Sequence, residues 1–200
     1  MKTNLESEIL VLRLWRQIYQ TYTLLKQCED KILEEYGLTT EQFAVLGTVD
    51  YFVGPTNVTD IARWLERSTN SISMIIDRMV KAGLVRRIRD KGDRRVVRVV
   101  NTSKGENALK PASRAMFEVM RKHMSSLSHE DKSTVLSLLG TLKYEILECL
   151  NPGMDVEKMK RDESKQAANV KEWLSKYGLP SIPQAKHQGG EKRKTKKKTE

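Results

Sequence analysis

Hydrophobic residues recur at the three- and four-residue spacing of an α-helix over most of this chain. Pairs of residues that suit a helix N-cap stand ahead of three of these stretches: Thr39 with Gln42, Asn57 with Asp60, and Ser128 with Asp131. Glycine or proline follows several of the stretches, where a helix would end. The pattern predicts helices over about residues 5–36, 39–52, 57–65, 68–82, 103–125 and 128–150.

The first predicted helix is apolar on two faces. Leu5, Ile9, Leu12, Trp15, Tyr19 and Tyr22 form one stripe, and Leu14, Ile18, Leu25, Ile32 and Leu33 form the second. A helix of this kind is not a simple surface helix, because both stripes need to be covered. We therefore expect its own domain to cover one face and a second subunit to cover the other.

Residues 84–100 change from the helical pattern to a strand pattern. Two β-branched runs that also carry arginine, 84–89 and 96–100, flank a charged loop that contains Gly92. This arrangement predicts a β-hairpin. A short helix, a tight turn and a longer helix precede the hairpin, which is the layout of a winged helix-turn-helix.

The predicted fold class is therefore mainly α (α+β). A winged helix-turn-helix domain over 38–102, with its wing at 84–100, is expected between long terminal helices over 5–36 and 103–150. Asn151-Pro152-Gly153 ends the last of these helices. An extension over 151–183 follows, in which Val170, Trp173, Leu174 and Tyr177 could form one docked helix or belong to a solvated linker. Residues 184–200 are expected to be a disordered basic tail.

The formal net charge of +10 is concentrated in two segments. Residues 63–104 hold twelve basic and four acidic side chains, and residues 184–200 hold seven and two. A concentrated basic block favours a polyanion partner, most simply nucleic acid. The longest stretch without a charged residue, Ser133 to Leu142, is too short to cross a membrane. Glu6 and Glu8 interrupt the place of a signal peptide, so we expect a cytoplasmic protein.

The chain carries no Walker loop, zincin motif, nucleophile elbow or cofactor fingerprint. Its three histidines, His123, His129 and His187, suggest neither a catalytic triad nor a zinc cluster. Cys28 and Cys149 are expected to be reduced structural thiols, with peroxide sensing by Cys28 as the alternative. We therefore expect no enzymatic activity, no cofactor and no metal.

The ordered motifs resemble the multiple-antibiotic-resistance regulator (MarR) family of transcription factors over about residues 5–150. The wing sequence Asp93-Arg94-Arg95 adds specificity to the resemblance. The matching stretches are LTTEQFAVL at 38–46, VTDIARWL at 58–65, SISMIIDRMVKAGLVRR at 71–87, DKGDRRVVRVVNTSKG at 90–105 and LSHEDKSTVLSLL at 127–139.

The resemblance implies a homodimer in which the first, fifth and sixth helices of both subunits interlock. It implies a ligand-responsive repressor that binds double-stranded DNA at a pseudo-palindromic operator, an inverted repeat. The fourth helix would enter the major groove and the wing the adjacent minor groove. The alternatives are a nonspecific architectural DNA-binding protein and a winged-helix module that binds another protein.

The expected DNA-contacting residues lie on the fourth helix and in the wing. Ser68 and Thr69 could act as helix caps alone, and Met74 stands where the family often carries an arginine. In the wing, the resemblance implies that Asp93 orients Arg95 toward the minor groove. The full expected set is Ser68, Thr69, Asn70, Ser71, Ser73, Met74, Arg78, Arg94 and Arg95.

The resemblance also implies an effector pocket between the dimer helices and the winged domain. The candidate lining residues are Trp15, Tyr19 and Met116, and the candidate ligand is a small aromatic molecule. The alternative for these three side chains is that they belong to the hydrophobic core.

Overall fold

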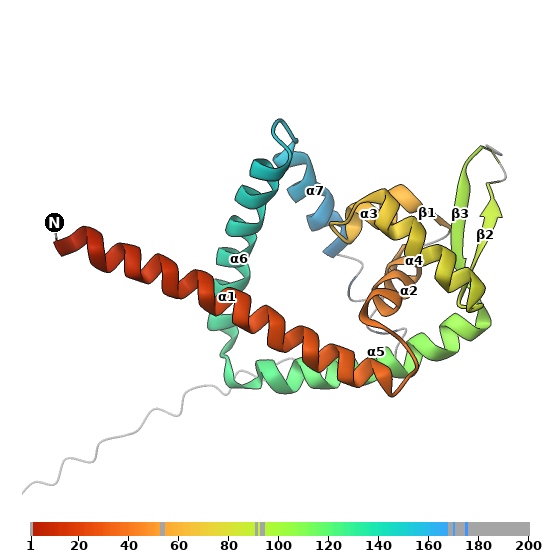
Figure 1. Cartoon of the computed structure of the whole chain (residues 1–200), viewed down its shortest axis with the longest axis horizontal. Coiled ribbons are helices and arrows are strands. Elements are labelled where there is room, and N and C mark those ends of the chain that lie inside the picture. The colour runs from red at the N-terminus through yellow and green to blue at the C-terminus, as the bar shows by residue number, and fades with distance from the viewer. Residues whose placement is uncertain are drawn as a thin grey trace, which may run out of the picture.

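The computed structural model of the chain describes residues 2–52, 55–90, 92, 95–167, 170 and 175. It contains every predicted helix and both predicted strands, with ends shifted by a few residues (Figure 1). The elements are α1 (Lys2–Glu34), α2 (Thr40–Tyr51), β1 (Thr56–Asn57), α3 (Val58–Trp64), α4 (Thr69–Lys81), β2 (Val85–Arg89), β3 (Val97–Asn101), α5 (Ser103–His123), the 3-10 turn η1 (Met124–Ser126), α6 (His129–Leu150) and α7 (Val156–Ala167).

Two of these elements extend the sequence prediction. Strand β1 was not predicted, and it pairs with β3. Helix α7 lies within the predicted extension but ahead of its proposed apolar stripe. Of that stripe, Trp173, Leu174 and Tyr177 lie outside the described residues, as does the predicted tail over 184–200.

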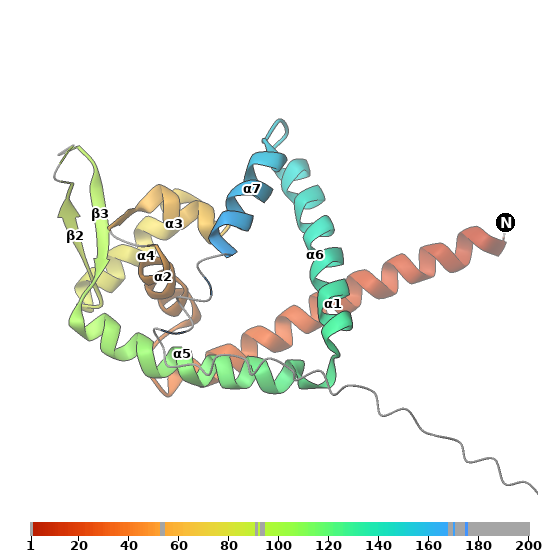
Figure 2. The same ribbon diagram turned by 180° about the vertical axis from the view of Figure 1, so that it is seen from behind.

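The helices form an angular frame with the winged domain at one end (Figures 1 and 2). Helix α5 runs along the base, α6 rises from its far end, and α2, α3, α4 and the sheet lie over its first half. Helix α7 returns from the top of α6 toward α3 in both views. No helix of the described residues is long and apolar enough to cross a membrane.

Local capping chemistry sets the helix starts. Thr39 and Ser128 form the predicted capping boxes with Gln42 and Asp131, and the Asn57 side chain accepts a hydrogen bond from the Asp60 backbone N–H. At the end of α1, Gly37 takes a positive φ of 66° and the Leu38 N–H bonds to the carbonyl of Leu33. This closure turns the chain from α1 into α2.

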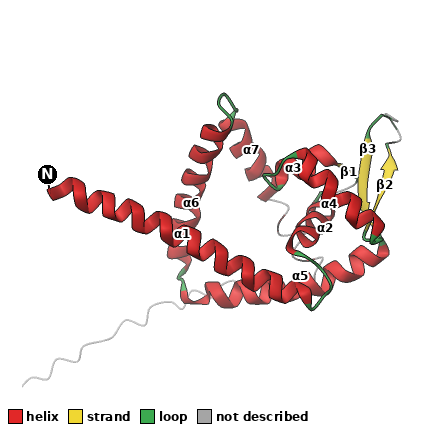
Figure 3. Ribbon diagram, viewed as in Figure 1, coloured by secondary structure: helices red, strands yellow, loops and turns green. Residues whose placement is uncertain are grey.

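One hydrophobic core joins the winged domain to the end of α1 and the first half of α5. Leu33, Leu46, Ile61, Ile76 and Leu109 are among its fully buried side chains. Strand β3 lies between β1 and β2 in an antiparallel sheet, and Val99 and Val85 are also buried there (Figure 3). The core therefore fixes α4 and the wing as one body.

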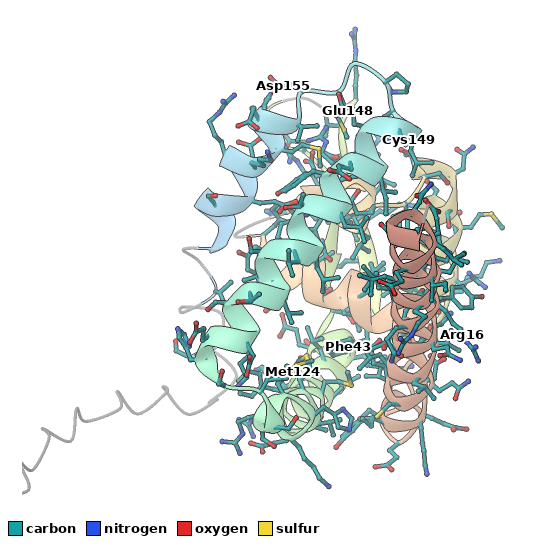
Figure 4. All side chains as sticks on the ribbon, turned by 90° about the vertical axis from the view of Figure 1, so that its left-hand side faces the viewer. Arg16, Phe43, Met124, Glu148, Cys149 and Asp155 are labelled. Carbon is teal, nitrogen blue, oxygen red and sulfur yellow. The ribbon has the colours of Figure 1, made fainter. Side chains whose placement is uncertain are left out.

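Most of α1 and all of α6 lie outside this core. The first stripe of α1 is exposed in the single chain, and α6 contributes no buried side chain. Of the second stripe, which the chain's own domain was expected to cover, Leu33 is buried, but Leu14 and Leu25 are exposed, because α1 contacts the core only near its C-terminal end. Figure 4 shows α6 from the left-hand side of Figure 1, with Met124 of η1 near its lower end and Glu148 and Cys149 near its upper end. The exposed large apolar residues of these helices include Leu5, Ile9, Leu12, Trp15, Tyr19, Tyr22, Val135, Leu138, Leu139, Ile146 and Leu150.

Candidate nucleic-acid interface

The turn between α3 and α4 sets the direction in which α4 leaves the core. Glu66 adopts a left-handed φ of 53°, a position that usually favours glycine. The Arg67 N–H bonds back to the Ala62 carbonyl at 2.9 Å, which closes α3. Ser68 then caps α4 by accepting a hydrogen bond from the Ser71 N–H at 3.2 Å. Of the two candidate caps, Ser68 is therefore the N-cap and Thr69 is the first helical residue.

Helix α4 is divided into a buried face and an exposed polar face. Ile72, Ile75, Ile76 and Met79 are buried at the spacing of one helix face, whereas Val80, at the edge of this face, is 38% exposed. This difference follows from its place one residue past the buried stripe. On the opposite face Thr69, Asn70, Met74 and Arg78 are exposed, and Ser71 and Ser73 are half-buried.

The exposed face of α4 offers hydroxyls, an amide and a guanidinium to a binding partner. These groups can bond base edges or phosphate oxygens. Met74, 65% exposed, lies in the middle of this face. A thioether cannot make the bidentate contact to guanine that an arginine makes, but it can contact a thymine methyl group.

Polar contacts from the wing and α5 hold α4 in place. The Arg87 guanidinium of β2 bonds to the Asp77 carboxylate of α4 at 2.5 Å. At the end of α4, the Lys104 ammonium bonds to the Ala82 carbonyl at 2.8 Å, where a cation also suits the helix dipole. Thr102 caps α5 and donates to the Gly83 carbonyl at 2.6 Å. These contacts hold the exposed polar face of α4 in a fixed position relative to the wing and α5.

An ion pair that sequence analysis did not predict braces the wing. The Arg98 Nε bonds to the Asp90 carboxylate at 2.7 Å, and its Nη1 bonds to the Pro55 carbonyl at 3.2 Å. The second Asp90 oxygen accepts the Gly92 N–H at 2.8 Å. Arg98 thereby joins β3 to the residue before β1 and to the end of β2.

The predicted wing-tip residues are described only in part. Arg95 is exposed in the turn between β2 and β3, whereas Asp93 and Arg94 lie outside the described residues. The expected orientation of Arg95 by Asp93 therefore stays a prediction. The Asp90–Arg98 ion pair joins the two sides of the hairpin next to this turn.

The candidate effector residues occupy two different environments. Met116 is buried in the core of its own subunit, whereas Trp15 and Tyr19 are exposed on α1. Their shared pocket stays a prediction. Among the described residues, no group of three or more His, Cys, Asp or Glu side chains could hold a metal ion.

Several bracing contacts join residues that lie far apart in the sequence. Asp77 and Arg87 are ten residues apart, and Arg98 and Pro55 are forty-three apart. No local spacing marks such pairs. The only signal for Asp90 and Arg98 was their position at opposite sides of a predicted hairpin, where cross-strand partners of opposite charge meet.

The sequence is similar to a family of known transcriptional regulators. The family model described as "MarR family" matches residues 36–96, which run from α2 through β2 and end just before β3. The transcriptional regulator MgrA of Staphylococcus aureus is 31% identical over 125 residues, a match that covers 62% of this chain and 79% of MgrA.

Solved structures extend the similarity beyond the winged domain. The ligand-free organohalide-sensing transcriptional regulator RdhR is 25% identical with a TM-score of 0.65, over 72% of this chain and 84% of that one. RdhR has also been crystallised with 2,4-dichlorophenol. Reduced AbfR bound to DNA is 27% identical with a TM-score of 0.58, over 72% of this chain and 98% of that one.

Proposed function

The chain belongs to the MarR family of winged helix-turn-helix transcriptional regulators, and from this premise we propose that it reads a pseudo-palindromic operator as a homodimer. The observation that carries the proposal is the division of α4 into a buried apolar face and an exposed polar face. Asn70, Ser73 and Arg78 are the base- and phosphate-contacting candidates on that face. A B-DNA major groove, about 12 Å wide, accepts one such helix.

The wing supplies the second contact of each half-site. Its turn carries Arg95, and a guanidinium suits the negative potential of a narrow, A·T-rich minor groove. Basic side chains near the interface, including Arg67 and Arg86, are exposed and available to phosphates. This combination supports base contacts from α4 and shape-dependent contacts from the wing.

The exposed apolar faces of α1 and α6 support dimerisation. A soluble monomer rarely exposes so large an apolar surface, and two copies can cover each other's stripes. A two-fold dimer then presents two α4 helices to half-sites about one turn of DNA apart.

The response to a ligand is proposed by analogy with RdhR, which has been crystallised with 2,4-dichlorophenol. A small aromatic molecule bound near Trp15, Tyr19 and Met116 would lie where α1, α5 and a second copy meet. Its binding would shift the spacing of the two α4 helices and release a repressed operator. Such a repressor would act where the chromosome lies, in the cytoplasm.

Selection of bound duplexes from a random DNA pool tests the proposed function. The expected result is an inverted repeat with half-sites about ten base pairs apart. Arg95→Ala should weaken binding to the selected operator by about 1–3 kcal/mol and relax the preference at the minor-groove positions. Arg121→Ala, which removes an exposed cation on α5, is the matched control and should bind like the parent.

Two outcomes would contradict the proposal. Enrichment of no common sequence, together with strong salt dependence, would favour nonspecific DNA packaging. An Arg95→Ala variant that binds the operator like the parent would show that the wing does not enter the minor groove. A repeat of the selection with added chlorophenols or aromatic acids tests the ligand response.

A further inference from the structure

Helix α7 lies outside the segment that the family model matches, and it bridges two parts of the fold. The chain reverses after α6, and α7 then runs from the top of α6 back toward α3 in both opposite views (Figures 1 and 2). Figure 4 shows Asp155, just before α7, beside the end of α6 that carries Glu148 and Cys149. The extension thus connects the predicted dimerisation region to the DNA-binding domain.

Glu163 fastens α7 to α6 through both of its carboxylate oxygens. The Lys143 ammonium lies 2.5 Å from one oxygen, and the Tyr144 hydroxyl donates to the other at 2.7 Å. Lys160 of α7 lies 5.2 Å from the centre of the Tyr144 ring, within range of a cation–π contact. Lys143, Tyr144 and Glu163 are half-buried and Lys160 is exposed. Together they form a network rather than a single ion pair, and networks hold better than isolated pairs.

The charge state of this network matches its geometry. Burial alone would raise the pKa of Glu163, but the hydrogen bonds from Lys143 and Tyr144 outweigh it and lower that pKa. Burial, together with the hydrogen bond to Glu163, raises the pKa of Tyr144 to about 12. At neutral pH Glu163 is therefore a carboxylate and Tyr144 keeps its proton.

Helix α7 also lies near α3, with a cavity between them, and burial and the negative charge of Glu163 raise the pKa of Glu66 there, while Lys143 opposes that rise. Met159, Asp162 and Glu163 line a cavity of about 130 Å³ together with side chains of α3 and the following turn, among them Trp64 and Glu66. A larger space of about 1260 Å³ separates the middle of α6 from the α3–α4 turn. Helix α7 closes one side of that space, so it spans from α6 to the element that precedes the recognition helix.

We propose that Glu163 is a positioning residue for DNA recognition, which locks α7 between α6 and α3 and so fixes the winged domain relative to the dimerisation helix. The proposal rests on the proposed function as a dimeric operator-binding protein. A dimer selects half-site spacing by holding its two recognition helices at a set separation. If the winged domain could move relative to α6, the dimer could bind half-sites at other separations. The attachment of α7 through Glu163 would therefore determine which half-site separation the dimer prefers.

The test compares Glu163→Lys with Glu157→Lys, which makes the same charge change on the same helix. Glu157 pairs with Lys160 of α7, and the Glu157→Lys change leaves the bonds of Glu163 to Lys143 and Tyr144 in place. The double variant Lys143→Glu with Glu163→Lys restores opposite charges and serves as the rescue. Each full-length protein is measured against the selected operator and against the same half-sites moved apart by one base pair.

Glu163→Lys should reduce the preference for the native spacing about two- to fivefold, the range expected for loss of one partly exposed ionic contact. Hydrogen exchange should become faster in the amides of α7 and stay unchanged in α4. Glu157→Lys should keep the spacing preference, and the charge-swapped double variant should recover it.

Two results would overturn the proposal. An undiminished spacing preference in Glu163→Lys beside a discriminating parent would show that α7 does not position the winged domain. Unaltered α7 exchange in Glu163→Lys would show that Glu163 does not hold the helix. A parent protein that selects no inverted repeat would overturn the proposed function as well, which separates the two failures.

Discussion

At the scale of single residues, Asp90 holds the turn of the wing in position. Each oxygen of the Asp90 carboxylate accepts a hydrogen bond, one from Arg98 and the other from the Gly92 N–H, and both partners are parts of the hairpin. An aspartate near DNA repels phosphate, so its removal should strengthen nonspecific binding by charge alone. A loss of operator affinity on its removal would therefore report positioning.

Asp90→Asn should weaken binding to the selected operator by about 0.5–1 kcal/mol, because Arg98 loses its ionic partner and the wing turn loses its support. Titration of a labelled operator measures the effect. Glu118→Gln, which removes a carboxylate that pairs with Arg121 on α5, gives the comparison and should bind like the parent. Tighter operator binding by Asp90→Asn would mean that charge outweighs positioning and that the brace has no part in recognition.

Gly105 lies where the start of α5 closely approaches the backbone that follows α4. A Cβ at this position would lie 2.1 Å from the Leu84 carbonyl oxygen and 3.0 Å from a Leu46 methyl group. The backbone carbonyl cannot move aside without disturbing the cap that Thr102 makes there. Only glycine fits.

Gly105→Ala should destabilise the fold by about 1–3 kcal/mol through overpacking. Gly47→Ala is the matched control, because nothing lies within 4 Å of its added Cβ and alanine favours the interior of α2. The control should gain up to about 1 kcal/mol. Chemical denaturation compares the two, and equal stabilities would contradict the close approach.

At the scale of elements, the predictions succeeded where the cause is local. The caps at Thr39 and Ser128 depend on partners three residues away, so the sequence contains the whole interaction. Strand β1 has two residues and exists because Thr56 and Asn57 pair with Val99 and Arg98 across the fold. No periodicity can mark so short a strand, and the left-handed Glu66 could not be predicted from a glutamate.

The capping box of α6 predicts an acid-sensitive helix start. Hydrogen bonds from the side chain and backbone of Ser128 lower the pKa of Asp131. A carboxylate with a lowered folded-state pKa stabilises the fold above its unfolded value, about 3.9, and this contribution is lost as pH falls through the folded-state pKa. The effect belongs to the window below about pH 4.

Asp131→Asn should therefore lose less stability than the parent between about pH 4 and pH 2. Ser128→Ala, which removes the hydroxyl that donates to Asp131 at 2.6 Å, should reduce the pH dependence in the same direction. Thermal melts followed by circular dichroism over this range measure both variants. Identical pH profiles for all three proteins would show that the capping box does not persist in solution.

At the scale of the whole molecule, the sequence predicted the architecture better than the interface. The two-faced first helix predicted a partner, and the first stripe of α1 is exposed in the single chain. The polar face of α4 followed from its apolar spacing. The contacts of Asp77 and Asp90, and the position of α7 near α3, depend on the folded arrangement. Local sequence patterns therefore could not predict them.

The apolar face of α6 gives the last prediction, which concerns assembly. Leu139 is 49% exposed in the single chain and is not part of the core that holds the winged domain. If two copies bury this face, Leu139→Glu places an unpaired carboxylate in an apolar interface at a cost of several kcal/mol. The winged domain should stay folded while the dimer dissociates.

Sedimentation equilibrium should show a monomer for Leu139→Glu and a dimer for the parent. Ser133→Glu, an added charge at an exposed polar position of the same helix, should remain dimeric. Operator affinity should fall steeply for Leu139→Glu alone, because a monomer contacts one half-site and loses the advantage of two linked contacts. A dimer that persists at parental affinity would show that α6 is not part of the interface, and a folded monomeric parent would refute the two-fold mode of operator binding.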